Sequence, residues 1–572
     1  MIRIAEIKLT LAQAETPAST DTALRAAACG ILALAPEALA DVHVFKRSFD
    51  ARKAELMAVF IVDITLADPT QEAAVLQQLA GRPNVSTTPD MDWHAPITPD
   101  AAAAWAQNHP QAPRPVVVGF GPCGIFAALV LAQMGLRPIV LERGKAVRQR
   151  TKDTWGLWRK NLLQAESNVQ FGEGGAGTFS DGKLYSQIKD PRHLGRKVMN
   201  EFVKAGAPEE ILYAAHPHIG TFKLVKVVEN LREQIIALGG EVRFQQRVTD
   251  FIIEGEGEHR QLRGLRVLDQ SSGEAGGQVS ELRADQVILA LGHSSRDTFE
   301  QLHARGVFIE SKPFSIGFRI EHPQGTIDRA RWGRHAGHPL LGAADYKLVH
   351  HASNGRAVYS FCMCPGGTVV AATSEPGRVV TNGMSQYSRN ERNANAGIVV
   401  GIEPRDYPGN DPLAGMRLQR ELESRAYVLG GSTYEAPGQL VGDFVAGRPS
   451  TEFGEVLPSY KPGVKLGDLH QALPAYAIEA MREALPLFGR KIAGFDRHDA
   501  VLTGVETRTS APLRITRGDD YQSLNLRGLY PAGEGAGYAG GILSAGVDGI
   551  KVGEAVALTR VTAGPRERPH SR

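Results

Sequence analysis

Four side chains in the sequence could move a proton or act as a nucleophile beside a bound molecule: His293, Asp181, Lys183 and Cys364. Asp181 and Lys183 are ionisable groups in the glycine-rich stretch 170–184. They could donate protons to a bound small molecule, or take part in an ion pair that holds the loop. His293 directly follows the apolar run 286–292 and could shuttle protons at the end of a strand.

The residues after His293 also allow a purely structural interpretation, which we favour. Ser294 and Asp297 have the spacing of a capping box, with Asp in place of Glu, and so predict the start of a helix. Under this interpretation His293 helps to begin a helix and has no chemical role.

Cys364 stands two residues after Cys362, in the stretch 358–367 that ends in Pro-Gly-Gly. In a continuous strand the two side chains share one face, with Cα atoms about 6.6 Å apart, at the edge of disulfide reach. The pair could be redox-active thiols, but two small buried apolar groups beside a turn are the favoured interpretation.

A glycine loop between two apolar runs predicts where a nucleotide binds. Val116–Val118 leads into Gly119, Gly121 and Gly124, a helical pattern follows, and a second run ends at Glu142. This is the βαβ unit that binds dinucleotides: its glycines allow a tight turn, close approach of the backbone to the diphosphate, and helix-to-strand packing. The Glu142 carboxylate can accept both ribose hydroxyls. The same glycine spacing at 172–177 and 535–540 lacks the following helix and strand, so only the first loop is predicted to be a Rossmann loop.

Residues 1–90 predict a separate small domain ahead of this unit. Strands at 2–11, 42–49, 55–66 and near Val85 alternate with helices at 21–34 and 70–79, which is the ferredoxin-like order βαββαβ. Its basic residues could form a surface for a partner or RNA, although a solvated face is favoured because acids lie among them: Lys46, Arg47, Arg52 and Lys53.

The remaining chain divides by composition. We expect a proline-rich linker at 91–114, a first nucleotide-binding segment at 115–312, an inserted and mainly β substrate domain at 313–490, a return to the nucleotide-binding fold at 491–560, and a disordered tail at 561–572. The predicted fold class is therefore α/β: a Rossmann-type domain interrupted by a β domain and preceded by the ferredoxin-like α+β domain.

Composition excludes several classes of function. The 572 residues contain 64 Lys+Arg and 62 Asp+Glu, a net charge of +2, so no overall field attracts DNA or an acidic membrane. Four cysteines predict no disulfide framework, and no metal-ligand set stands out. No apolar run reaches about 18 residues, and the first residues lack a signal-peptide pattern. We expect a cytoplasmic protein without a membrane span.

Several long strings resemble the FAD-dependent dehydrogenases of unassigned substrate, and more distantly the geranylgeranyl-reductase and glutathione-reductase types of FAD fold. The strings are residues 45–53, 171–184, 292–294, 361–367, 381–385 and 530–546. The resemblance implies noncovalent FAD, with the helix that begins at Gly541–Ile542 directed at the flavin ring. It implies no substrate. Glu534 departs from the pattern, because many related flavoproteins carry Asp there. The residues expected around FAD are Gly119, Gly121, Pro122, Cys123, Gly124, Glu142, Arg143, Gly174, Gly175, Ala176, Gly177, Thr178, Val248, Ala290, Gly292, Gly533, Glu534, Gly541 and Ile542.

The leading hypothesis is an oxidoreductase that exchanges a hydride between the flavin N5 and a small-molecule substrate. NAD(P)H or another donor would bind only transiently, because the chain carries no second complete Rossmann fingerprint. Two alternatives stay open: a flavin-containing protein that associates with RNA or modifies it, and a thiol oxidoreductase that uses Cys362 and Cys364.

Overall fold

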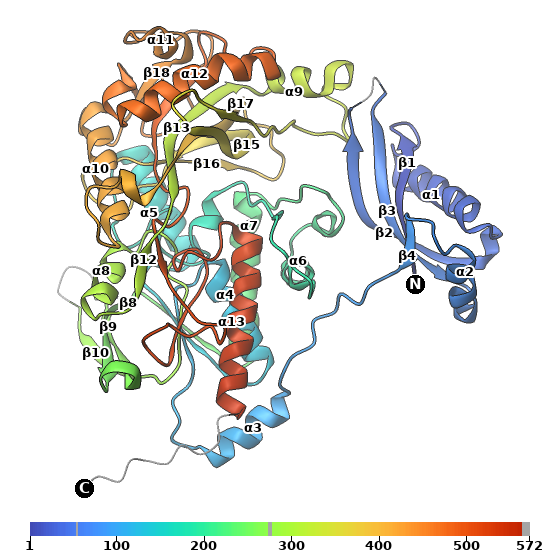
Figure 1. Cartoon of the computed structure of the whole chain (residues 1–572), viewed down its shortest axis with the longest axis horizontal. Coiled ribbons are helices and arrows are strands. Elements are labelled where there is room, and N and C mark those ends of the chain that lie inside the picture. Colours follow the sequence, from blue (N-terminus) through green and yellow to red (C-terminus); the bar gives the residue numbers. More distant parts are fainter. Residues whose placement is uncertain (53–54, 273–276, 563–572) are drawn as a thin grey trace.

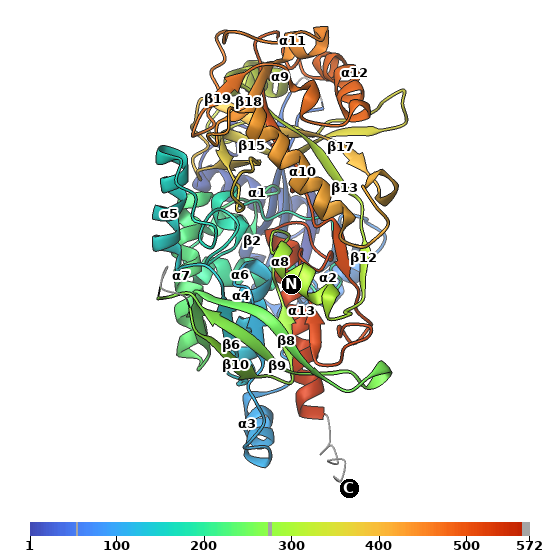
Figure 2. The ribbon, with the colours of Figure 1, turned by 90° about the vertical axis from the view of Figure 1, so that its left-hand side faces the viewer.

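The computed structural model describes residues 1–52, 55–272 and 277–562. Lys53 and the predicted tail beyond Thr562 lie outside the described residues. The inserted domain is stacked on the nucleotide-binding domain, and the N-terminal domain stands beside both (Figures 1 and 2). The predicted α/β fold class is confirmed.

The nucleotide-binding domain is built on a parallel sheet with the strand order β22-β11-β5-β6-β7. These strands are short, and the central ones are entirely buried, as expected for a sheet covered on both faces. Their bounds are Leu529–Pro531 (β22), Val287–Leu289 (β11), Val116–Val118 (β5), Ile139–Glu142 (β6) and Glu241–Phe244 (β7). The chain leaves β5 for β6 on one side and later returns as β11 on the other. Ligands bind at such a switch point, at the carboxyl ends of the strands.

Helices cover one face of this sheet and a second sheet covers the other. The helical layer is α4 (Pro122–Gln133), α7 (Thr221–Ala237) and α13 (Ile542–Thr562), and the antiparallel layer is β8 (Gln246–Glu254), β9 (Gln261–Asp269) and β10 (Val279–Arg283). Helix α13 lies beside α4 (Figure 1) because Gly549 and Gly553 leave room. A Cβ on Gly549 would lie 2.2 Å from the Cys123 carbonyl oxygen.

The stretch 241–254 forms two strands rather than one. Gln245 adopts a left-handed backbone with φ of 59°, so β7 ends at Phe244 and β8 starts in the other sheet. An apolar pattern alone does not reveal this break, because nothing in the residue types around Gln245 demands a turn.

The inserted domain contains a large mixed sheet with the order β14-β15-β17-β13-β20-β18-β19, and β16 pairs with β15. Its strands are β13 (Phe314–Pro323), β14 (Val349–His351), β15 (Ala357–Ala371), β16 (Thr381–Ser385), β17 (Asn393–Ile402), β18 (Ala436–Leu440), β19 (Val464–Leu466) and β20 (Val501–Glu506). The helices α9 (Gln324–Trp332), α10 (Ala414–Leu429), α11 (Val441–Ala446) and α12 (Ala475–Lys491) make it more helical than the sequence suggested.

Strand β20 corrects the predicted boundary at 490/491. Residues 491–560 are predicted to return to the nucleotide-binding fold, but β20 pairs with β13 and β18 inside the inserted sheet. A buried apolar strand is compatible with either sheet, and long-range pairing decides between them.

The N-terminal domain has the sheet order β2-β3-β1-β4, with two helices, which confirms the ferredoxin-like arrangement. Its elements are β1 (Ile2–Thr10), α1 (Pro17–Leu32), β2 (Leu39–Asp50), β3 (Met57–Leu66), α2 (Glu72–Gln78) and β4 (Val85–Thr87). The predicted linker is extended only in part, because Thr98 caps a helix, α3 (Pro99–Asn108).

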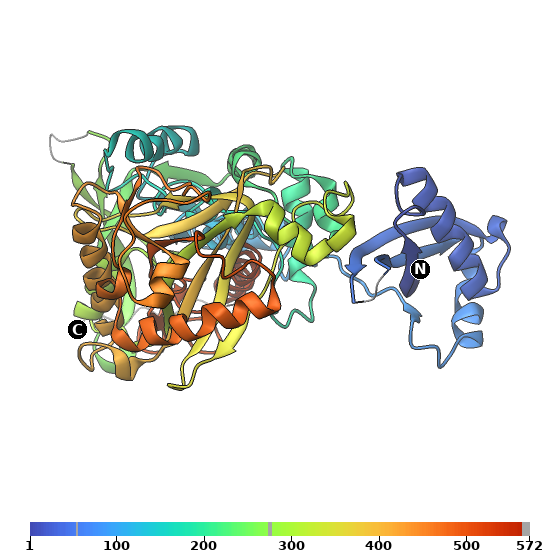
Figure 3. The same cartoon turned by 90° about the horizontal axis from the view of Figure 1, so that it is seen from above.

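The edge strand β2 attaches this domain to the rest of the chain. The Arg47 N–H donates to the Tyr213 carbonyl (2.6 Å), and the Ala215 N–H donates to the Arg47 carbonyl (2.9 Å). The Arg47 guanidinium lies 5.3 Å from the centre of the Tyr213 ring. From above, the domain is a separate lobe (Figure 3). Arg47 is therefore an interdomain contact rather than part of a free basic surface.

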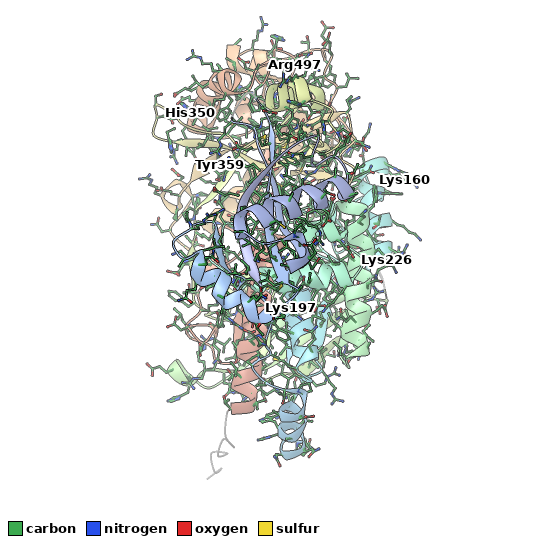
Figure 4. All side chains as sticks on the ribbon, turned by 90° about the vertical axis from the view of Figure 1, so that its right-hand side faces the viewer. Lys160, Lys197, Lys226, His350, Tyr359 and Arg497 are labelled. Carbon is green, nitrogen blue, oxygen red and sulfur yellow. The ribbon has the colours of Figure 1, made fainter. Side chains whose placement is uncertain are left out.

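Trp93, in the segment that follows the N-terminal domain, makes a second contact with the nucleotide-binding domain. Its indole N–H donates to Glu554 (2.8 Å), and the ammonium of Lys197, which Figure 4 labels at the lower margin of the lobe, lies 4.4 Å from its ring centre.

Arg47→Ala is expected to loosen this lobe. Loss of a cation–π contact of about 0.5–1 kcal/mol should raise the rate of proteinase K cleavage between residues 88 and 98 by about 2–5-fold. Arg52→Ala is the matched control, because Arg52 is 84% exposed and, among the described residues, forms its ion pair with Asp50 of its own domain. Equal cleavage rates in the two variants would contradict this account of the docking.

Candidate functional site

A cavity of about 390 Å³ opens at the carboxyl ends of β5 and β11. This volume falls within the range of roughly 300–1,000 Å³ typical of ligand sites. Most residues expected around the cofactor line it: Gly119, Gly121, Pro122, Cys123, Glu142, Arg143, Gly175, Ala176, Gly177, Val248, Ala290, Gly292, Glu534, Gly541 and Ile542. Gly124, Gly174, Thr178 and Gly533 do not appear in the wall; they lie behind it and shape the loops.

The glycines of the Rossmann loop are required by close backbone packing. A Cβ on Gly119, whose φ is 98°, would lie 2.3 Å from the Ala290 carbonyl oxygen. A Cβ on Gly124 would lie 1.9 Å from the Gly119 carbonyl oxygen, so α4 packs against its own loop only with glycine there. A Cβ on Gly175 would lie 2.8 Å from the Gly121 Cα, which shows that the two glycine loops meet backbone to backbone.

Glu142 ties these two loops together. Its carboxylate accepts N–H bonds from Phe120 (2.9 Å), Gly144 (2.8 Å) and Gly172 (2.9 Å), and it lines the cavity. One oxygen accepts a single N–H and keeps a lone pair that a ribose hydroxyl could use. The residue thus organises the site as well as facing the ligand.

A buried arginine that the sequence analysis missed shapes the second glycine loop. Arg150, on α5 (Val147–Lys160), donates to the carbonyls of Asn168, Val169, Gly172 and Glu173. Burial lowers its pKa to about 10. The only sequence signal is an arginine on a helix followed by a glycine-rich loop, which is too common a pattern to identify the contact.

Arg143 lines the cavity with its charge already balanced. Its guanidinium bonds to Glu166 and Asp297 and lies 4.1 Å from the centre of the Phe171 ring. Asp297 is therefore an ion-pair partner, and the predicted capping box is wrong. Helix α8 (Arg296–Ala304) starts after Ser295 without a side-chain cap, and the Ser294 hydroxyl instead accepts from Arg508 (3.0 Å).

His293 lines the cavity, with Nδ1 2.9 Å from the Ser294 hydroxyl. Burial, together with the positive charges of Arg508 and Arg296, lowers its pKa to about 3. The ring is neutral near pH 7, so it can exchange a hydrogen bond with a ligand but is no imidazolium acid.

Asp181 and Lys183 both line the cavity, but they do not pair with each other. Asp181 is 1% exposed and forms a bidentate ion pair with Arg389, whose charge outweighs the effect of burial and lowers the Asp181 pKa. The Lys183 ammonium donates to the Met363 carbonyl. Lys183 therefore keeps two N–H donors for other partners.

The two neighbouring cysteines differ in position. Strand β15 is irregular between Phe361 and Cys364, and Cys362 adopts a left-handed backbone with φ of 44°. Both cysteines lie within β15, but this irregularity means that they do not have the geometry that a regular strand would give them. Both thiols are free; Cys362 lines the cavity, whereas Cys364 is buried and does not appear in its wall.

The other end of the cavity is formed by polar residues of the inserted domain that the sequence analysis did not name as site residues. Thr381 and Asn382 come from β16, and Glu506 comes from β20. Glu534 also faces this space, and within the described residues its carboxylate has no hydrogen-bond partner. Burial raises its pKa to about 8. An unpartnered carboxylate in a cavity wall suits a ligand rich in hydroxyl groups, and a glycine-lined end suits a diphosphate.

Residues 1–52, 55–272 and 277–562 lack two kinds of feature. No helix there has the length and hydropathy needed to cross a membrane. No cluster of His, Cys, Asp and Glu in the same ranges could hold a metal ion.

Comparison with known proteins gives two matching families. Residues 313–509 match the family described as FAD-dependent protein, C-terminal domain-like, and residues 1–65 match a domain of unknown function (DUF8436). An uncharacterized protein of Clostridium beijerinckii is 46% identical over 529 residues, which are 92% of this chain and 94% of the relative.

Several solved structures resemble the chain at low sequence identity. The glycerol-3-phosphate dehydrogenase from Bacillus halodurans complexed with FAD is 11% identical, with a TM-score of 0.33 over 81% of this chain and 67% of that one. A geranylgeranyl bacteriochlorophyll reductase-like protein from Thermoplasma acidophilum is 14% identical, with a TM-score of 0.32 over 78% and 79%. The chain belongs to the same family as the Clostridium beijerinckii protein, its residues 313–509 belong to the FAD-dependent proteins that the matching family describes, and its cofactor is FAD.

Proposed function

We propose that this protein exchanges a hydride between FAD and a small-molecule substrate that binds between the flavin and the inserted domain. The observation that carries the proposal is the continuity of one cavity. Its wall runs from the Rossmann loop at Gly119 to Thr381, Asn382 and Glu506 on the inserted sheet. A site of this shape brings a nucleotide cofactor and a second molecule together in one enclosed space.

The residues of the two glycine loops would hold the FAD diphosphate, and Glu142 and Glu534 would accept from its hydroxyl groups. When bound, FAD supplies a ring that takes up or gives a hydride at N5. The start of α13 at Ile542 faces the cavity, and its positive end would favour negative charge on that ring. Lys183 and neutral His293 would orient the substrate through hydrogen bonds. The walls of the inserted domain would exclude water.

The alternatives gain no support from the site. The basic residue Arg47 is occupied at a domain interface, and Arg52 is paired with Asp50. Cys364 does not appear in the cavity wall. The cytoplasmic location stays a prediction.

The proposal is tested by mixing the FAD-loaded protein with NADH or NADPH in the absence of oxygen. We expect at least one of them to bleach the oxidised flavin absorbance, and deuterium at its C4 to slow the bleaching, because a hydride transfer breaks that C–H bond. A flavin that stays oxidised with both would exclude nicotinamide as the direct donor. Bleaching at the same rate with the deuterated donor would argue against a rate-limiting hydride step.

A further inference from the structure

A fully buried arginine lies behind the substrate end of the cavity and connects its own strand with four other strands of the inserted sheet. Arg319, on β13, donates to the Glu506 carboxylate (2.7 Å), the Cys362 carbonyl (2.8 Å), the Asn382 side-chain oxygen (3.1 Å) and the Asn395 side-chain oxygen (3.3 Å). Three of these partners line the cavity: Cys362, Asn382 and Glu506.

The space around this guanidinium is closed. Arg319 is 0% exposed, and a Cβ on Gly383 would lie 2.8 Å from one of its terminal nitrogens. A positive charge without access to water must be balanced by a negative charge beside it. Two acidic side chains act on Arg319: the Glu506 carboxylate accepts its hydrogen bond, and the Cys362 thiolate, whose backbone carbonyl also accepts from Arg319, acts on it through its charge.

Glu506 is 2% exposed and is bonded to Arg319 through one oxygen only. Its second oxygen has no hydrogen-bond partner among the described residues. Burial raises its pKa to about 7, against the lowering effect of Arg319. The carboxyl group therefore carries a proton for part of the time near neutral pH.

Cys362 is held in a conformation that costs energy. A left-handed backbone at a non-glycine residue is uncommon, and such strain gathers at functional sites. The Cys362 carbonyl is fixed by Arg319, which positions the residue at the cavity wall. A hydrogen bond with Cys364, and then the charges of Arg319 and Lys183, lower the pKa of the Cys362 thiol.

We propose that Cys362 and Glu506 share one proton beside Arg319 and act together as the acid–base pair for the substrate. A single positive charge supports a single negative charge in a dry pocket, and a second anion close by is unfavourable. The other titratable groups that influence this pair are Lys183, Asp181, Cys364 and Glu534. The inference rests on the proposed function for the identity of the hydride acceptor.

The chemical step is a proton transfer that accompanies oxidation of the substrate. The bond between hydrogen and the substrate atom next to the oxidised carbon breaks, and its electron pair stays on the substrate to form the new double bond. The proton joins the sulfur of Cys362 or the oxygen of Glu506. The hydride leaves the carbon for the flavin. In the reductive direction the pair returns the proton.

The pair is tested by the pH dependence of Cys362 alkylation with iodoacetamide in the purified full chain, followed by mass spectrometry of the peptide. The thiolate is the reactive form, so the pH at which the alkylation rate reaches half of its maximum, called the midpoint below, reports the thiol pKa. We expect the wild-type midpoint to lie at a lower pH than the midpoint of Cys29. Glu506→Gln should lower the Cys362 midpoint by about one further pH unit, which corresponds to a tenfold larger fraction of thiolate well below the midpoint. Removal of the competing carboxylate leaves the thiolate as the only anion beside Arg319.

The matched control is Glu391→Gln, which removes an exposed carboxylate of the same domain outside the cavity wall and should leave the midpoint unchanged. An unchanged midpoint in Glu506→Gln would overturn the shared proton. If Glu506→Gln does not fold, a wild-type Cys362 midpoint at or above the midpoint of Cys29 would equally overturn the shared proton. The alkylation needs no turnover, so failure of hydride exchange with an intact midpoint shift would count against the proposed function alone.

Discussion

Glutamine in place of Glu423 is expected to lower the free energy of unfolding by about 3–5 kcal/mol. Glu423, on α10, is 0% exposed, and its two oxygens accept from Arg296 and Arg508. Arg296 begins α8 of the nucleotide-binding domain, so the carboxylate connects that domain with the inserted one. The neutral amide leaves two buried guanidinium groups with too little negative charge. Arg296 keeps an ion pair with Glu375, but Glu375 also pairs with Arg378 and Arg420.

The control lies two residues away on the same helix. Glu421 is 45% exposed and pairs with Arg425, so Glu421→Gln should cost about 0–0.5 kcal/mol in urea unfolding. Equal losses in the two variants would contradict the role of the buried cluster.

The effect of Glu423 should also depend on pH. Burial pushes its pKa up, but Arg296 and Arg508 outweigh burial and hold the pKa well below the ordinary value of 4.5. A carboxylate with a lowered folded-state pKa stabilises the protein above its unfolded pKa and loses that contribution as the pH falls. The difference in stability between wild type and Glu423→Gln should therefore be constant near pH 7 and shrink below about pH 4.5.

Gly124→Ala is expected to weaken FAD binding by about 10–100-fold. The added Cβ would lie 1.9 Å from a backbone oxygen of the Rossmann loop, so the start of α4 must shift, together with the amides that we propose bind the diphosphate. Overpacking of this kind costs roughly 1–3 kcal/mol, which corresponds to that loss of affinity. Fluorescence titration of the apoprotein with FAD measures the change.

Gly30→Ala on α1 is the control, because no atom lies within 4 Å of its added Cβ. Gly124 does not appear in the cavity wall. Unchanged affinity of Gly124→Ala for FAD would therefore mean that helix-to-strand packing at this residue does not position the Rossmann loop.

Local patterns predicted the parts of the site that are continuous in the chain. The βαβ unit from Val116 to Glu142 and the ferredoxin-like order of the N-terminal domain are set by short-range periodicity and by glycines whose backbone role is fixed. The Rossmann loop and the glycine-rich stretch 170–184 are predicted in this way.

What the sequence did not reveal depends on contacts between distant residues. Arg319 meets Glu506 and Cys362 only because β13, β15 and β20 join one sheet, and no local pattern specifies that pairing. The Ser294 and Asp297 pattern was misleading for the same reason. Both side chains are drawn away from the helix start by arginines from elsewhere, Arg508 and Arg143.

The central claim is that the cavity at the ends of β5 and β11 holds FAD. The most direct test is to titrate the apoprotein with FAD, separate free from bound flavin, and then release the cofactor by denaturation. The account predicts one FAD per chain, bound tightly enough to colour the protein yellow and released intact by unfolding. A chain that stays colourless and retains no flavin after reconstitution would contradict it.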